Sequence, residues 1–115
     1  MRITILPEPE HEVIAREELV GGFGGEFYER PDGRIYYRHQ ADKRHWFANR
    51  DARTFRAYVA AYERWREAVT RTANDEEQCR LVQSLRGQMQ ELEPLGDPDS
   101  CYWSIILEQT EDGLL

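Results

Sequence analysis

The sequence has a single lysine, two cysteines and no long apolar run. No apolar segment approaches the roughly 20 residues that a membrane-spanning helix needs, so we expect no membrane association. The opening residues, Met1–Glu12, mix one early arginine with prolines and acids, which is not the pattern of a secretory signal. Without export, Cys79 and Cys101 are expected to be buried free thiols of a cytoplasmic protein rather than a disulfide.

The length and charge of the chain indicate one small acidic domain. A chain of 115 residues is most simply a single domain that spans residues 1–115. Its net charge of −7 is unevenly distributed: residues 1–29 carry −5, residues 30–73 carry +6 and residues 74–115 carry −8. The basic middle either pairs internally with the acidic ends or leaves an acidic surface that receives a basic partner.

Aromatic and β-branched residues predict a β-hairpin in the basic middle region. Glu26–Arg30 and Arg34–His39 flank a Pro-Asp-Gly turn, in which Gly33 is free to adopt a left-handed conformation. Lys43–Ala48 predicts a third strand beside this hairpin. The middle region is therefore expected to form an antiparallel sheet.

The N-terminal region gives weaker signals than the hairpin. Ile3–Leu6 predicts a short strand that ends at Pro7, because proline cannot donate to a β-ladder. The segment His11–Leu19 is expected to form a short helix or an irregular connection. Gly21–Gly25 is expected to be a flexible turn.

Three segments predict helices from their capping residues and apolar spacing. The expected caps are Asn49, Asn74 and Asp97, and Pro98 would occupy the first position of the third helix. That third helix contains the apolar segment Trp103–Leu107, which we expect to cover the core. The apolar stripes of the first two helices are Phe55, Tyr58, Val59, Tyr62, Trp65 and Val69, followed by Cys79, Val82, Leu85, Met89 and Leu92.

No residue pattern predicts a reaction or a metal site. His11, His39 and His45 lack the spacing of a zinc signature, and a site formed by His39 and His45 alone would have too few ligands. Neither the Gly-x-Ser-x-Gly pattern of hydrolases nor the Gly-Lys-Ser/Thr of a phosphate-binding loop is present. We therefore predict a protein that is not an enzyme and has no catalytic residue, cofactor or metal.

Arginines alternate with aromatic residues in the middle region, and aromatic rings beside arginines on a sheet can stack nucleic-acid bases. The residues concerned include Arg30, Arg34, Arg38, Tyr28, Tyr36 and Tyr37. The apolar pattern assigns many of these rings to the core, and the whole chain is acidic. A nucleic-acid-binding protein is therefore the least favoured of the functions considered.

Several segments together resemble the SUKH superfamily of bacterial immunity proteins, and its fourth subfamily in particular. They are Gly25–Tyr28, Gly33–Tyr37, the strand Trp46–Asn49 that leads into a helix with Phe55 and Tyr62, and the closing segment Asp97–Glu108. The likeness covers roughly residues 21–115. It implies an α+β fold: a small antiparallel sheet of three or four strands, including the aromatic hairpin, packed against about three helices on one face.

The resemblance also implies a function, namely non-catalytic binding of a cognate polymorphic toxin, often a nuclease or a deaminase. An acidic surface suits the positive groove of such an enzyme, so the expected partner is a basic toxin domain, bound by a monomer or homodimer. The candidate partner-binding residues are Glu91, Glu93, Asp97 and Asp99. The alternative from another class is a small adaptor or regulatory subunit of a bacterial or phage complex.

Overall fold

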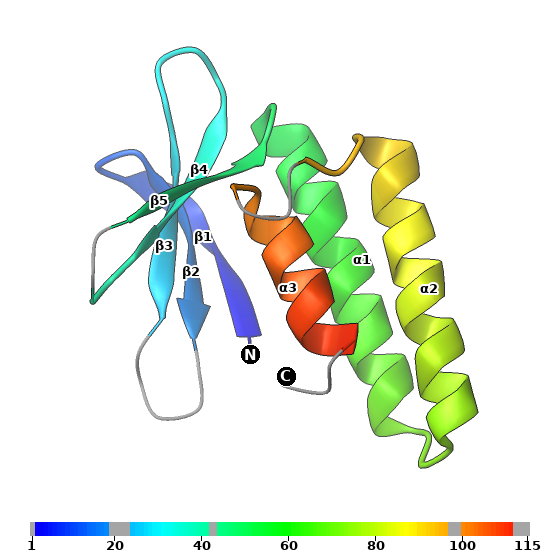
Figure 1. The fold of residues 1–115 in the computed structure, drawn as a ribbon. Coiled ribbons are helices and arrows are strands. Elements are labelled where there is room, and N and C mark those ends of the chain that lie inside the picture. The colour runs from blue at the N-terminus through cyan, green and yellow to red at the C-terminus, as the bar shows by residue number, and fades with distance from the viewer. Residues whose placement is uncertain (1, 19–23, 42–43, 97–99, 112–115) are drawn as a thin grey trace.

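The computed structural model describes residues 2–18, 24–41, 44–96 and 100–111. It confirms an α+β fold in which helices cover one face of an antiparallel sheet (Figure 1). The sheet has five strands in sequential order, where three or four were expected. The strands are β1 Arg2–Glu10, β2 Val13–Glu18, β3 Gly25–Glu29, β4 Ile35–His39 and β5 His45–Asn49, and the helices are α1 Ala52–Thr70, α2 Asp75–Leu92 and α3 Tyr102–Glu111.

The additional strand is β2, which pairs with β1 in an N-terminal hairpin, so the prediction of a helix or irregular connection at His11–Leu19 is wrong over the described residues 13–18. β1 also continues past Pro7, because β1 is an edge strand and its pairing with β2 shifts between Ile5 and Glu10. The two turn residues, His11 and Glu12, have φ angles of 50° and 72°. Such left-handed turns usually contain Asn or Gly, and their absence here hides the hairpin from sequence reasoning.

The predicted hairpin of β3 and β4 is confirmed, with Gly33 at a φ of 88° in its turn. At the other end of β3, a Cβ at Gly25 would lie 2.6 Å from the ring of Tyr37. Glycine is therefore required at this position, because any side chain would clash with the Tyr37 ring and the Arg38 backbone oxygen. β5 follows as the third strand of this region, paired antiparallel with β4.

Trp103 lies at the centre of the core, with none of its surface exposed. Its indole ring packs within 5.5 Å of the Tyr58 ring on α1 and within 6.4 Å of the Phe27 ring on β3, measured between ring centroids. In Figure 1, α1 and α3 lie next to the sheet, where both contact β5, while α2 is farthest from the sheet. The apolar C-terminal segment thus covers the core, as its sequence predicts.

Two of the three helix starts differ from the prediction. The first helix is capped by Asp51, whose carboxylate accepts a hydrogen bond from the Thr54 N–H at 2.7 Å. Asn49, the predicted cap, is instead the fully buried last residue of β5. The cap of α2 is Asn74, as predicted. The third helix begins only at Tyr102, and the predicted Asp97 and Pro98 lie outside the described residues.

The apolar stripe of α2 is shorter than predicted. Val82, Leu85 and Met89 are buried, but Cys79 and Leu92 are exposed. Both cysteines are free, as expected, although only Cys101 is buried. Within the described residues, every helix is too short or too polar to span a membrane.

Three buried tyrosines should couple the stability of the fold to alkaline pH. Burial raises the pKa of Tyr62 to about 12, and burial next to Glu17 raises the pKa of Tyr102 well above its usual value. Burial, followed by the nearby Glu93 charge, likewise raises the pKa of Tyr58. Since these shifts favour the protonated phenols, their stabilising contribution is complete below about pH 10 and is lost as the pH rises further.

We therefore expect the buried tyrosines to ionise only together with unfolding. The measurement is a base titration that follows phenolate absorbance and far-ultraviolet circular dichroism on the same sample. Ionisation of all six tyrosines while the helical signal persists would contradict the buried positions of Tyr58, Tyr62 and Tyr102.

Candidate protein-interaction site

The structure separates the four predicted partner-binding residues. Glu91 is exposed near the end of α2, where a binding partner can reach it. Glu93, only two residues later, is 7% exposed. Asp97 and Asp99 lie outside the described residues. Glu91 is therefore the one described member of the set whose carboxylate lies at the surface.

The Glu93 side chain belongs to an internal hydrogen-bond network that joins β5, α1 and the end of α2. Its Oε1 accepts hydrogen bonds from Asn49 Nδ2 at 3.3 Å and from the Arg50 backbone N–H at 3.0 Å. Its backbone oxygen accepts a hydrogen bond from the Tyr58 hydroxyl. The Asn49 side chain continues the network by accepting from Trp103 Nε1 at 2.8 Å. A partner therefore cannot use the Glu93 carboxylate without opening the core.

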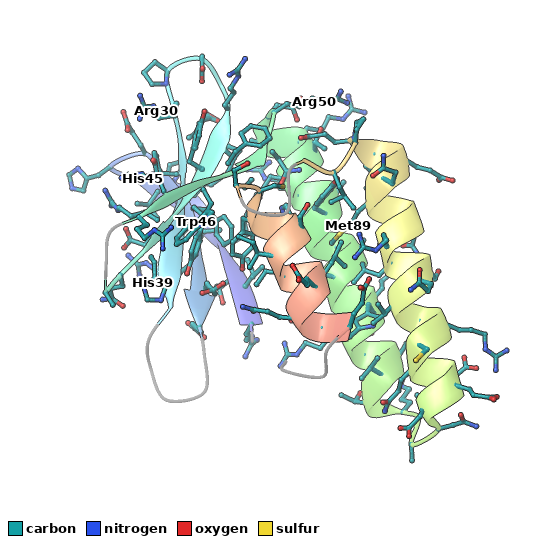
Figure 2. The ribbon with its side chains drawn as sticks, in the orientation of Figure 1. Arg30, His39, His45, Trp46, Arg50 and Met89 are labelled. Carbon is teal, nitrogen blue, oxygen red and sulfur yellow. The ribbon has the colours of Figure 1, made fainter. Side chains whose placement is uncertain are left out.

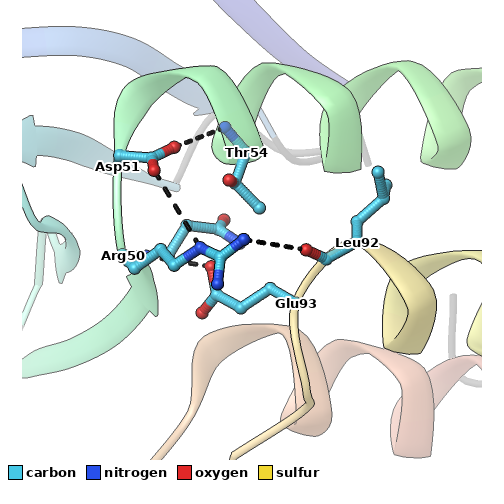
Figure 3. Close-up of polar contacts among 6 residues, drawn as sticks. Arg50, Asp51, Thr54, Leu92 and Glu93 are labelled. Atoms are coloured by element: carbon cyan, nitrogen blue, oxygen red, sulfur yellow. Dashed lines mark hydrogen bonds and ion pairs between the residues drawn. The ribbon is translucent and has the colours of Figure 1, made fainter.

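Arg50 closes this network at the surface, as Figure 3 shows. Its guanidinium donates to the backbone oxygen of Leu92 at 3.3 Å and lies 3.9 Å from Asp51 Oδ2. The hydrogen bond from the Thr54 backbone, followed by smaller effects that include the Arg50 charge, holds the pKa of Asp51 below its usual value. Arg50, which lies in the short junction between β5 and α1, thus joins the cap of α1 to the end of α2.

The opposite face of the sheet carries a second group of polar and aromatic residues, which we call the outer sheet face. Strand register places Tyr28 opposite Tyr36, and Tyr36 opposite Phe47. Since neighbouring residues of a strand point to opposite faces, these rings lie on the face away from the core residues Phe27 and Tyr37. The outer sheet face consists of Arg16, Glu26, Tyr28, Arg30, Tyr36, Arg38, His45 and Phe47.

Arginines stack on the tyrosines of the outer sheet face. The guanidinium carbon of Arg38 lies 5.5 Å from the centre of the Tyr28 ring, and that of Arg30 lies 5.9 Å from the centre of the Tyr36 ring. These are cation–π distances. Each ring fixes a guanidinium in place, which leaves the cation less conformational freedom to lose when it binds a ligand.

A shallow concavity of about 290 Å³ lies between the turn of the N-terminal hairpin and β3–β5. It is lined by His11, Glu12, Tyr28, Arg30, Arg38 and His45, among others. Arg38 Nη2 lies 3.2 Å from Glu26 Oε2, and the Tyr28 hydroxyl forms a hydrogen bond with His45 Nδ1. In Figure 2, Arg30 and His45 lie on the side of the sheet away from the helices.

Sequence reasoning identified the arginines and aromatic rings of the hairpin but did not divide them between two faces. The alternation of Phe27 with Tyr28, and of Tyr36 with Tyr37, carries that information once the strands are assigned. The contribution of His11 was not recognisable, because the first hairpin itself was missed. Among the described residues, no three side chains of His, Cys, Asp or Glu gather in a group that could hold a metal ion.

The fold and these surfaces define a small α+β protein that offers donors and cations on its open sheet face, and exposed acids on its helical layer. A model of the SUKH-4 immunity protein family matches residues 13–109, which is most of the chain. The chain belongs to the SUKH-4 immunity protein family, in agreement with the resemblance seen in its sequence. Comparisons with curated proteins and with solved structures found no match.

Proposed function

We propose that this immunity protein neutralises a cognate bacterial polymorphic toxin of the nuclease or deaminase type by binding it in the cytoplasm, without catalysing a reaction. The observation that carries the proposal is the family match across residues 13–109. The immunity protein is a single domain that binds the toxin as a monomer or as a homodimer. No cofactor or metal enters this mechanism.

The exposed acids of α2 support a basic toxin domain as the partner. Asp75, Glu76 and Glu77 occupy the first turn of the helix, and Glu91 lies near its last turn. A net charge of −7 gives the molecule a negative field, which attracts and orients the positive groove of a nucleic-acid enzyme. Glu91, together with Asp97 and Asp99, remains our candidate for contact with that groove.

Reversing these acids should slow the capture of a basic toxin. We expect the triple variant Glu91→Arg, Asp97→Arg, Asp99→Arg to bind with an on-rate about tenfold lower and a weaker salt dependence, because steering charges act mainly on association. Binding kinetics at several salt concentrations, measured with the toxin domain encoded beside the gene, test this expectation. Growth of cells that co-express the toxin gives a second readout.

Glu67→Arg provides the matched control, since it reverses an exposed acid on α1. Glu93 is left unchanged, because reversal of that buried carboxylate would disturb folding rather than binding. If the unaltered protein forms no complex with the neighbouring toxin and does not restore growth, the proposed function fails. If the neighbouring genes belong to one metabolic or phage pathway and include no toxin gene, the alternative function as an adaptor subunit would be favoured.

A further inference from the structure

We propose that the outer sheet face is a second binding site, which takes a carboxylate-bearing segment of a protein partner. This site is separate from the exposed acids of α2, because the helices cover the other face of the sheet (Figure 1). Its charge is also opposite to that of α2. The inference does not depend on the toxin assignment and is tested without a toxin.

Arg30 gives the strongest evidence for a carboxylate-binding site. It is exposed at the end of β3, and its guanidinium is held over the Tyr36 ring. Within the described part of the chain, no carboxylate forms an ion pair with Arg30, although other arginines such as Arg34, Arg38 and Arg80 do have such partners. An oriented guanidinium without an acidic partner matches the bidentate geometry of a carboxylate ligand.

Arg38 and His45 extend the site from β3 across β4 to the edge strand β5. Strand register places Arg38 of β4 directly opposite His45 of β5, so both side chains lie on the outer sheet face. Glu26 contacts only Nη2 of the Arg38 guanidinium, which has five N–H donors in all. The hydrogen bond between the Tyr28 hydroxyl and His45 Nδ1 fixes the orientation of the His45 ring. Arg38 and His45 are therefore positioned by the protein before any ligand arrives.

The shape of the concavity indicates a side chain rather than a large ligand. Its volume of about 290 Å³ is at the lower end for small-molecule sites, which span roughly 300–1,000 Å³. One wall is the hairpin turn at His11 and Glu12, where two residues other than glycine adopt positive φ. Glu12 is the one acid among the lining residues named above, so the concavity has more cationic than anionic groups.

The same contacts argue against stacking of nucleic-acid bases on this face. Base stacking needs exposed aromatic faces. Tyr28 is only 7% exposed and lies under Arg38, while Arg30 lies over Tyr36. Tyr28 and Tyr36 thus position the guanidinium groups and are not platforms themselves. An acidic protein segment uses the donors without needing the rings.

The test is a nuclear magnetic resonance titration of the full chain at low salt. The probe is a blocked pentapeptide with three glutamates flanked by glycines, and the matching peptide contains glutamines instead. We expect the glutamate peptide to shift signals of Tyr28, Arg30, Arg38 and His45 selectively, and the glutamine peptide to leave them unchanged. Arg30→Gln should weaken peptide binding about tenfold, because a charge-assisted hydrogen-bonded pair is lost.

Arg80→Gln is the matched control, since Arg80 is an exposed arginine on α2, away from the sheet. It should bind the glutamate peptide as the unaltered protein does. Equal weakening by Arg80→Gln and Arg30→Gln, or shifts scattered over the whole surface, would overturn the proposal. A thymidine oligonucleotide of equal charge that binds the outer sheet face more tightly than the peptide would also overturn it, in favour of a nucleic acid.

Discussion

Replacing Trp103 by alanine is expected to lower the free energy of unfolding by about 3–5 kcal/mol, the cost of emptying the site of a large core aromatic. Trp103 is fully buried and packs against rings from β3 and α1. The substitution also removes the hydrogen bond from its indole nitrogen to Asn49. The measurement is urea denaturation followed by circular dichroism.

Two further variants make this result interpretable. Trp103→Phe keeps a ring in the core but removes the indole N–H, and we expect a loss of about 1–3 kcal/mol from the unpaired Asn49 oxygen. Leu92→Ala alters an apolar residue that is 39% exposed, and it should change stability by less than about 1 kcal/mol. If Trp103→Ala costs no more than Leu92→Ala, then α3 is not a structural part of the core.

Removal of the buried carboxylate of Glu17 is the second large effect that we expect. Glu17 lies on β2 and is 6% exposed. Its Oε1 accepts a hydrogen bond from the Tyr37 hydroxyl at 2.6 Å, and its Oε2 accepts one from the Tyr102 hydroxyl. The carboxylate thereby joins β2 and β4 to the first residue of α3.

Glu17→Ala should lower the free energy of unfolding by about 2–4 kcal/mol, because two buried hydroxyl groups lose their acceptor. The cost of burying a carboxylate, which the variant no longer bears, keeps the net loss below the sum of the two hydrogen bonds. Glu18→Ala is the matched control: Glu18 is exposed on the opposite face of the same strand, and its removal should change stability by at most about 0.5 kcal/mol.

A double-mutant cycle with Tyr102→Phe identifies the origin of the Glu17 effect. If the hydrogen bond matters, the losses from Glu17→Ala and Tyr102→Phe should combine to less than their sum. Strictly additive losses, or a Glu17→Ala variant as stable as Glu18→Ala, would show that the carboxylate does not join α3 to the sheet.

The elements with short-range signals were predictable from the sequence. The Pro-Asp-Gly turn and its flanking aromatic residues specify the β3–β4 hairpin within fifteen residues, and the apolar spacing from Phe55 specifies α1. The N-terminal hairpin was not predictable in this way. Its turn uses His11 and Glu12 where glycine or asparagine is usual, so the conformation depends on the pairing of β2 with β3.

The roles of the polar residues depended on contacts between distant segments. By residue type, Asn49 suggests a helix cap and Glu93 suggests a surface charge. In the structure, their side chains form a hydrogen bond inside the core, although they are 44 positions apart in the sequence. Similarly, Glu17 meets Tyr102 from 85 positions away. Such pairs leave no periodic signal in the sequence. Glu91, in contrast, is exposed, as its position near the end of a predicted helix suggested.

The charges of the molecule are arranged so that its two faces suit different chemistry. The basic middle of the sequence supplies Arg30 and Arg38 of the outer sheet face, and the acidic C-terminal part supplies the exposed acids of α2. Internal pairing accounts for part of this pattern, as between Arg38 and Glu26. We propose recognition as the role of both faces, so stoichiometric binding is the central claim about function.

The most direct test of that claim is a titration of the toxin's catalytic activity with the immunity protein at concentrations well above their dissociation constant. We predict that activity falls linearly and ends at an equimolar ratio, or at a fixed multiple of it if the protein binds as a dimer. The same end point should be reached after short and long incubation. Complete loss of activity at a small fraction of the equimolar amount, increasing with time, would show turnover and contradict a protein that acts by binding alone.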